Sequence, residues 1–180
     1  MNCARPIFLV GFMACGKSTL LQALARRVGG RAFVDLDSEI ERRAGMSVAD
    51  IFRVHGQEHF RSLEVRVLAE YAGTDAVVAC GGGTPCRPGA MELMKKAGTV
   101  VWLRADIDTT LRRLRLVPGQ RPLVDDVLAD EAALRERVAA MMSERFPYYG
   151  MADAVFDSSR LETEGEIADS AENFINHFLR

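Results

Sequence analysis

Residues 7–19 read IFLVGFMACGKST, and this stretch decides the fold. A short apolar run, Ile7–Val10, is followed at once by the pattern G-x-x-x-x-G-K-[ST]. After it, Leu20, Leu21 and Leu24 recur at helical spacing. A buried strand, a glycine-rich loop and a helix in this order are the context in which such a loop binds phosphate. The stretch therefore predicts the opening strand, phosphate loop and first helix of an α/β domain.

The chemistry of phosphate explains the spacing in this loop. Gly11 and Gly16 let backbone N–H groups turn toward phosphate oxygens, and the N-terminus of the following helix adds a partial positive charge. Lys17 can reach the β- and γ-phosphates, and the Ser18 hydroxyl can take a place on Mg²⁺. A chance glycine turn is the alternative. The loop predicts a nucleoside triphosphate, without saying what is done with it.

The rest of the chain alternates short apolar runs with amphipathic segments of helix length, the pattern of a parallel α/β sheet. Asp108 could cap a helix that ends at Leu116, and Asp130 could cap another that ends at Arg145. Four further strands are expected, at Ala32–Asp35, 76–80, 99–103 and Ala154–Asp157.

Composition bounds the classes of partner. The chain has 180 residues, 48% of them hydrophobic and 27% charged, with a net charge of −2. One domain fits this length, and nothing favours nucleic acid or a membrane as partner. The apolar runs are too short to span a bilayer, and the first residues do not resemble a signal peptide, so we expect a cytoplasmic protein. No exposed apolar stripe stands out, which makes a monomer the default.

Four cysteines and a pair of histidines offer no clear site. No C-x-x-C pair occurs, so reduced thiols are expected. His55 and His59 are four residues apart, but Gly56 lies between them and no third ligand is evident. We expect a solvated pair here, in preference to a metal site.

Two carboxylates follow the second predicted strand. If the segment 35–37 stays extended, the Asp35 and Asp37 side chains point the same way, toward the crevice at the carboxyl ends of the strands. One acid could then order the water molecules of a magnesium ion while the other accepts a hydrogen bond from an attacking hydroxyl. Alternatively, Asp37 only caps a helix over 38–44. The two roles are compatible.

Three consecutive glycines, Gly81, Gly82 and Gly83, follow the third predicted strand. Such a run is costly in backbone entropy. It is typical of main chain that approaches a ligand closely and donates N–H groups to it. A flexible turn is the alternative interpretation.

One arginine lies on an apolar helix face. Leu134, Val138, Met141 and Arg145 fall on one side of the predicted helix. A guanidinium in this position needs an anionic partner, because an unpaired charge is expensive to remove from water. A solvated helix end is the alternative.

A second arginine belongs to the predicted helix 58–71, where Phe60, Glu64, Val67 and Tyr71 share a face. Arg61 precedes Glu64 by three residues and can pair with it, which would fix the direction of the guanidinium. Two converging arginines suit bidentate recognition of a carboxylate.

The connection 116–126 breaks the alternation, with two prolines, a glycine and several charges. It is either a plain link between helices or a lid that closes over bound substrates. A lid suits phosphoryl transfer, which requires that water be excluded.

Together these motifs resemble the shikimate kinase family over about residues 5–160. The resemblance rests on GFMACGKST at 11–19, DLD at 35–37, GQEHFRSLE at 56–64, CGGG at 80–83, RPL at 121–123 and ERFPYY at 144–149. It implies a three-layer P-loop fold like that of nucleoside monophosphate kinases, with five parallel strands in the order 2-3-1-4-5. It also implies a single domain over residues 1–180, with a substrate-binding region at about 37–64 and a lid at about 113–126.

The resemblance further implies that ATP phosphorylates the 3-hydroxyl of shikimate, giving shikimate 3-phosphate and ADP on the route to chorismate and the aromatic amino acids. By the family pattern, the catalytic residues are Asp37, Lys17 and Arg121, and the magnesium residues are Ser18 and Asp35. Shikimate is held by Asp37, Arg61, Gly82, Gly83 and Arg145. The nucleotide is held by Ala14, Cys15, Gly16, Lys17, Ser18, Thr19, Arg113, Arg121 and Arg160.

The chain also departs from the family pattern. Ala14 and Cys80 stand where the family usually has glycine and threonine. The arginine that stacks on adenine does not align cleanly, because Arg113 and Arg115 straddle its expected place. The loop 158–160 is expected to border adenine.

Two other functions remain as alternatives: a different small-molecule kinase on the same fold, acting on gluconate or a nucleoside monophosphate, and an ATP-binding module without catalysis. A regulatory GTPase is disfavoured, since neither N-K-x-D nor D-x-x-G occurs in the chain.

Overall fold

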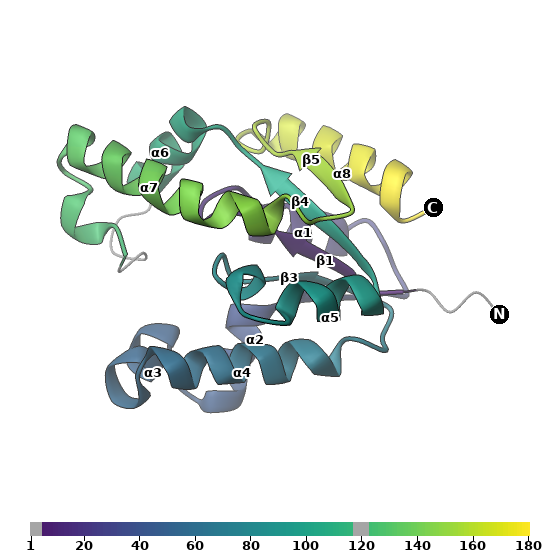
Figure 1. The fold of residues 1–180 in the computed structure, drawn as a ribbon. Helices are drawn as coiled ribbons and strands as arrows, with labels where there is room; N and C mark the ends of the chain where they lie inside the picture. The colour runs from purple at the N-terminus through teal and green to yellow at the C-terminus, as the bar shows by residue number, and fades with distance from the viewer. Residues whose placement is uncertain (1–4, 117–122) are drawn as a thin grey trace.

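A single parallel sheet organises the molecule. The computed structural model describes residues 5–116 and 123–180, and its strands run in the order β2-β3-β1-β4-β5 (Figure 1). This confirms the expected fold class. The strands are β1 Ile7–Val10, β2 Ala32–Asp35, β3 Ala76–Ala79, β4 Thr99–Arg104 and β5 Ala154–Asp157. Compared with the prediction, β3 ends one residue earlier and β4 one residue later.

Helices cover both faces of the sheet. They are α1 Lys17–Ala25, α2 Leu36–Ala44, α3 Val48–His55, α4 Gln57–Glu70, α5 Ala90–Ala97, α6 Ile107–Leu116, α7 Glu131–Tyr149 and α8 Glu164–Phe178, with short 3-10 turns at Thr84–Cys86 and Asp125–Val127. Two hydrophobic clusters form the core. Ile7 and Leu9 pack with α1 and α8, whereas Phe8 and Val10 face the cluster that contains α2–α7. This alternation along β1 produces the three layers.

Every residue of β1 and β3 is buried. Strands covered on both sides read as continuous apolar runs, which is why the sequence revealed them. Because β1 lies in parallel between β3 and β4, the loops that follow these strands meet at one edge of the sheet. The phosphate loop, the glycine run and α2 all begin at this edge.

Two helix boundaries differ from the prediction. Asp130 does cap α7, accepting 3.0 Å hydrogen bonds from the backbone N–H groups of Ala132 and Ala133. The helix then runs to Tyr149, beyond the expected end at Arg145, with Pro147 inside its last turn. At α6 the prediction of Asp108 as cap was wrong: the Thr109 backbone N–H donates to Asp106 at 2.7 Å.

Within the described ranges, no helix has the length and apolar character needed to cross a membrane. The three cysteines of these ranges, Cys15, Cys80 and Cys86, are free thiols.

Candidate active site

The phosphate loop ends at Gly16, whose φ of 97° lies in the left-handed region, and α1 starts at Lys17. The Lys17 ammonium folds back over the loop and donates 2.9 Å hydrogen bonds to the carbonyls of Gly11 and Phe12. These are the contacts of a lysine that holds its own loop in shape. The same ammonium also lines the cavity above the loop, where it can contact a bound phosphate.

Ala14 has a φ of 58°, and within the described ranges no other non-glycine residue has a positive φ. The left-handed conformation costs an L-residue about 1–2 kcal/mol. The alanine that replaces the usual glycine is therefore accommodated, with its backbone in the conformation that glycine would adopt freely. The loop stores a small strain as a result.

A cavity of about 350 Å³ opens above the loop. It is lined by Met13, Ala14, Gly16, Lys17, Ser18, Thr19, Asp35, Asp37, Ala79, Cys80, Gly81, Gly82, Arg113, Leu116, Leu161 and Glu162. Most residues predicted on the nucleotide side are among them. Cys15 is not, because its side chain is buried in the core, so only its backbone can serve a phosphate. Arg121 lies outside the described residues.

The two residues predicted for magnesium are in contact. The Ser18 hydroxyl donates a 2.6 Å hydrogen bond to the Asp35 carboxylate, at the floor of this cavity. Both are hard oxygen ligands, and magnesium is usually held by one or two such groups together with substrate phosphates. The described residues contain no cluster of three or more His, Cys, Asp or Glu side chains suited to a metal. The donor set therefore fits Mg²⁺ brought with a triphosphate.

The expected geometry of the aspartate pair was wrong in one respect. Segment 35–37 is not extended, because α2 begins at Leu36. Asp35 is the N-cap, accepting a 3.3 Å hydrogen bond from the Ser38 backbone N–H, and Asp37 lies in the first helical turn. Both acids still line the same cavity, since the N-terminus of α2 points into the crevice.

Asp37 occupies an unusual environment. Its Oδ1 atom is buried and has no hydrogen-bond partner among the described residues. Burial, followed by repulsion from Glu64 and Asp35, raises the pKa of Asp37 to about 6, against the smaller opposing influence of Lys17 and Arg61. A carboxyl group with this pKa is poised to accept a proton near neutral pH.

A second cavity, of about 310 Å³, adjoins the first. It is lined by Met13, Asp37, Val48, Phe52, Gln57, Phe60, Arg61, Glu64, Gly81, Gly82, Gly83, Leu123 and Arg145. Asp37 belongs to both linings, together with Met13, Gly81 and Gly82. A group bound in the second cavity can therefore meet a phosphate bound in the first at the Asp37 carboxylate.

Glu64 organises one wall of the second cavity. Its carboxylate is fully buried and accepts a 2.5 Å hydrogen bond from Arg61 Nη1 and another of 2.5 Å from the Thr84 hydroxyl. The predicted Arg61–Glu64 pair is thus present. Thr84 was not anticipated, because it lies on the 3-10 turn after the glycine run and no pattern linked it to α4.

The glycine run lies against charged side chains. A Cβ added at Gly81 would stand 2.7 Å from Glu64 Oε1 and 3.0 Å from Asp37 Oδ1, and one at Gly83 would stand 2.9 Å from Arg61 Nη2. At Gly82 the nearest atom would be Arg145 Nη1, at 3.3 Å. The close approach is therefore to the polar groups of the pocket, which a flexible turn would not require. Gly81 was missed as a site residue.

Arg145 reaches the second cavity from α7. Its guanidinium lies 5.5 Å from the centre of the Phe12 ring, a cation–π contact. The predicted apolar face was slightly misplaced: Met142 is buried where Met141 was expected, beside Leu134 and Val138. Arg145 still projects from the edge of that face. It lines the same cavity as Arg61.

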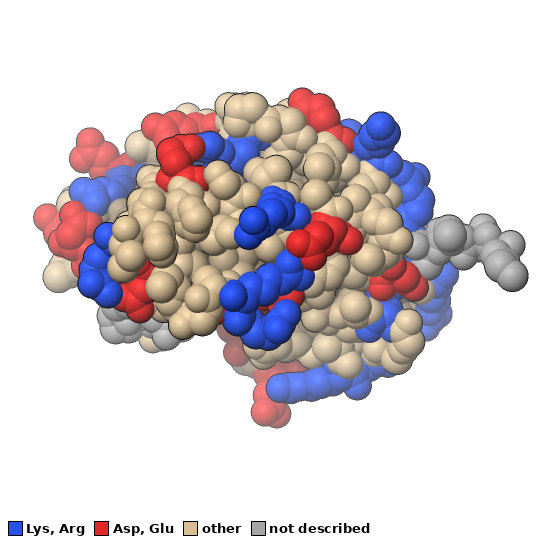
Figure 2. Space-filling model, turned by 90° about the horizontal axis from the view of Figure 1, so that it is seen from below, with Lys and Arg blue, Asp and Glu red and all other residues tan. Residues whose placement is uncertain are grey.

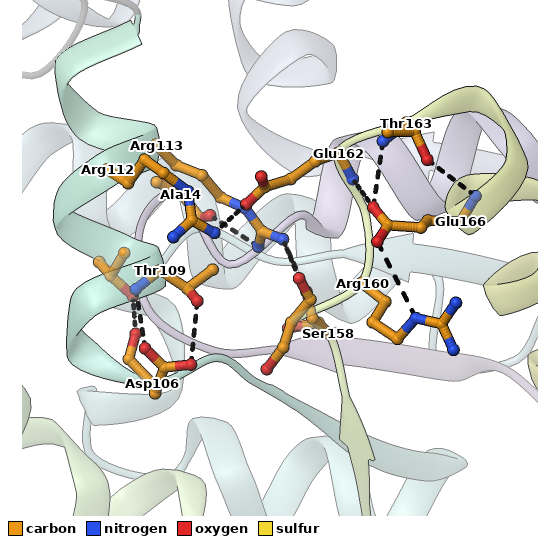
Figure 3. A network of polar contacts seen from close by, with 12 residues as sticks. Ala14, Asp106, Thr109, Arg112, Arg113, Ser158, Arg160, Glu162, Thr163 and Glu166 are labelled. Atoms are coloured by element: carbon orange, nitrogen blue, oxygen red, sulfur yellow. Dashed lines mark hydrogen bonds and ion pairs between the residues drawn. The ribbon is translucent and has the colours of Figure 1, made fainter.

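Arg113 does not have the free guanidinium that stacking on adenine requires. Figure 3 shows it between the phosphate loop and the segment after β5. Its Nη2 donates to the carbonyls of Ser158 at 3.0 Å and Ser159 at 2.9 Å, its Nη1 to that of Ala14 at 3.5 Å, and its Nε to Glu162 at 3.3 Å. Its role is to tie these two segments together at the rim of the nucleotide cavity.

The loop after β5 contributes other residues than expected. Leu161 and Glu162 line the nucleotide cavity, and Arg160 does not. The Arg160 side chain is 74% exposed and points toward Glu166 (Figure 3). Sequence patterns offered no signal for Leu161 or Glu162, because nothing in this loop matches a known motif.

Comparisons with known proteins agree with this geometry. A family model described as shikimate kinase matches residues 13–176. A shikimate kinase from Parabacteroides distasonis is 37% identical over 92% of this chain and 94% of that protein. The one from a Synechococcus strain is 43% identical over 82% of this chain and 75% of that protein.

Solved structures give the same result. A shikimate kinase from Bacteroides thetaiotaomicron superposes with a TM-score of 0.86 at 35% identity, covering 96% of this chain and 97% of that one. The Acinetobacter baumannii shikimate kinase in complex with shikimate superposes with a TM-score of 0.79 at 29% identity, covering 97% of this chain and 93% of that one. A gluconokinase from Sinorhizobium meliloti, at 15% identity and a TM-score of 0.56, shares the fold alone.

Proposed function

The chain belongs to the shikimate kinase family, and from this premise we propose that it transfers the γ-phosphoryl group of ATP to the 3-hydroxyl of shikimate. The products are shikimate 3-phosphate and ADP, on the route to chorismate and the aromatic amino acids. The single observation that supports this most strongly is the position of Asp37, which lines both the cavity above the phosphate loop and the cavity that contains two arginines.

Shikimate is a ring that carries one carboxylate and several hydroxyls. In the second cavity, Arg61 and Arg145 are the cationic residues that would hold the carboxylate. Arg61 is already oriented by Glu64, so little conformational freedom is lost when the substrate binds. With its carboxylate on the arginines, the ring would place hydroxyls toward Asp37 and the glycine run.

ATP and its magnesium ion would be bound by Lys17, Ser18 and Asp35. Lys17 would exchange its contacts to the Gly11 and Phe12 carbonyls for the β- and γ-phosphate oxygens. Ser18 and Asp35 would hold magnesium, the aspartate through water. Bound with ATP, this ion neutralises the charge on the phosphates.

The chemical step follows from positioning. The shikimate hydroxyl attacks the γ-phosphorus in line, the bond from phosphorus to the ADP oxygen breaks, and the hydroxyl proton passes to Asp37. Placing the two reactants side by side and neutralising charge supply most of the acceleration. The proton acceptor adds about 10²–10⁴-fold.

A lid that closes over the site belongs to the same proposal. We place a lid at about residues 113–126 and the substrate-binding region at about 37–64, within a single monomeric domain. Arg121, as part of that lid, would complete the charge on the transferred group. Exclusion of water would protect the phosphoryl group from hydrolysis.

The experiment is a coupled assay of ADP release with shikimate, gluconate and nucleoside monophosphates tested in parallel. We expect turnover with shikimate and only background with the others. Turnover with gluconate alone would contradict the assignment of the substrate. If no ADP is released with any of these substrates, the result would favour an ATP-binding module without catalysis.

A further inference from the structure

A third cavity, of about 260 Å³, lies between α2, α3 and α4. It shares no lining residue with the two cavities of the active site. Its lining consists of Ile40, Arg43, Ala44, Met46, Ile51, His55, His59, Leu63, Arg66 and Val67. The mechanism of phosphoryl transfer uses none of these residues.

The floor of this cavity is apolar and is formed by buried core residues. Ile40, Ile51 and Val67 come from three different helices, and each is at most 2% exposed. Leu63 and Met46 complete the apolar surface. A floor built from the packed core does not collapse easily, so the cavity can offer an apolar ligand a preformed surface.

The rim is basic. Arg43, Arg66, His55 and His59 line it, and no carboxylate does. Arg43 is already paired, with Glu39 and Glu70. In contrast, Arg66 and the two histidines have no hydrogen-bond or ion-pair partner among the described residues, although the imidazole rings lie 4.9 Å apart.

This combination specifies a class of ligand. We propose that the cavity is a second anion site, which binds a small monocarboxylate with a one-ring apolar body. The apolar body gains by leaving water on the isoleucine and valine floor. The carboxylate finds the Arg66 guanidinium and the imidazole N–H groups at the rim. In volume the cavity is close to the 310 Å³ substrate cavity, which by our proposal holds one six-membered ring.

The position of the cavity connects it to the active site. The same helices carry Asp37, Phe52 and Arg61 on the side that faces the substrate cavity. Figure 1 shows α2, α3 and α4 together below the sheet, and Figure 2 views the molecule from that side, where Lys and Arg side chains gather beside uncharged surface with Asp and Glu side chains among them. A ligand here would touch the back of the elements that hold the substrate.

The test uses 3-phenylpropionate as probe, with binding to the full chain measured by isothermal titration calorimetry. We expect saturable binding at one site, and binding at least about tenfold weaker for 3-phenylpropanol, which keeps the ring but lacks the charge. Arg66→Gln should lower the affinity for 3-phenylpropionate by a similar factor. Arg53→Gln is the matched control: this arginine is on α3, 75% exposed and outside the cavity, so the probe should bind as to the unaltered chain.

The substrate cavity also has two arginines, so it must be excluded as the site of binding. In Arg145→Ala, the probe should bind with unchanged affinity. Loss of binding in this variant would assign the probe to the substrate cavity and overturn the proposal. Absence of binding, equal affinity for the alcohol, or unchanged affinity in Arg66→Gln would also overturn it. The readout is binding and not ADP release, so its failure is distinguishable from failure of the proposed function.

Discussion

Arg61 and Glu64 form an ion pair of 2.5 Å in which the carboxylate is completely buried. A buried charge is tolerated only when it is paired and hydrogen-bonded, and here Thr84 supplies the second bond. The pair joins successive turns of α4 to the 3-10 turn behind the glycine run. The direction of the Arg61 guanidinium is thus set before any substrate arrives.

Glu64→Gln should therefore impair substrate binding more than nucleotide binding. The amide keeps the shape of the side chain but leaves Arg61 without its charged partner. We expect the KM for shikimate to rise about tenfold or more and the KM for ATP to stay within about twofold. Steady-state kinetics with each substrate varied will measure both constants.

Glu58→Gln is the matched control for this variant. Glu58 also lies on α4 and pairs with an arginine, Arg87, but its side chain is 80% exposed. Exposed ion pairs contribute little. If both variants changed the KM for shikimate equally, orientation of Arg61 by Glu64 would not be the cause.

The pH profile of kcat/KM for shikimate should report Asp37. Its pKa is raised to about 6, chiefly by burial, and only the ionised form can take the hydroxyl proton. Activity should therefore fall as pH drops below about 6 and level off above it. In Glu64→Gln this limb should move to lower pH, because one source of repulsion is gone. A limb that stays in place would contradict the assignment.

The same shift makes Asp37 costly to the folded state. Its folded pKa of about 6 exceeds the ordinary 3.8, so the folded protein binds more protons between these values and stability falls as pH rises through them. Asp37→Asn should increase the free energy of unfolding by about 2–3 kcal/mol near pH 7, and by less near pH 5. Its turnover should fall about 10²–10⁴-fold. Urea denaturation at both pH values, together with the ADP assay, measures this trade of stability for activity.

Gly81→Ala should lower activity although it replaces none of the charged residues of the site. The added methyl group would crowd both Glu64 Oε1, at 2.7 Å, and Asp37 Oδ1, at 3.0 Å. We expect a loss of about tenfold or more in kcat/KM, since small displacements of catalytic groups are costly. Gly73→Ala is the control, because nothing lies within 4 Å of its added carbon. Equal activity in the two variants would show that the approach of Gly81 is not required.

Arg113→Gln should loosen the nucleotide cavity. Its guanidinium satisfies the carbonyls of Ala14, Ser158 and Ser159, so the variant should lose about 1–3 kcal/mol of stability and bind ATP more weakly. Arg112→Gln is the matched control, because the neighbouring Arg112 also contacts Glu162 but its side chain is 53% exposed. Thermal denaturation and the KM for ATP should separate the two. Equal effects would contradict the role of Arg113 as a tie between segments.

Much of the fold was predictable because its signals are local. Fully buried strands such as β1 read as apolar runs, and the phosphate loop follows from one strict pattern. The strand order came from the resemblance to a family. In contrast, the start of α2 was mispredicted, since whether Asp35 or Asp37 caps a helix depends on the backbone and not on the presence of an aspartate.

The parts of the site that the sequence did not reveal depend on tertiary contacts. Sequence alone left the adenine-stacking arginine open between Arg113 and Arg115, because the carbonyls that bind the Arg113 guanidinium come from residues more than forty positions away. Thr84 and Gly81 matter only because α4 packs beside the turn after β3. The cavity among α2, α3 and α4 likewise exists only when three helices meet.

Recognition of the substrate depends most on Arg61 and Arg145 holding one carboxylate beside Asp37. The most direct measurement is the steady-state kinetics of Arg145→Ala with shikimate and ATP varied in turn. We predict that the KM for shikimate rises about tenfold or more while the KM for ATP changes by less than about twofold. An equal rise in both constants, or no rise for shikimate, would contradict the assignment of this cavity to the substrate carboxylate.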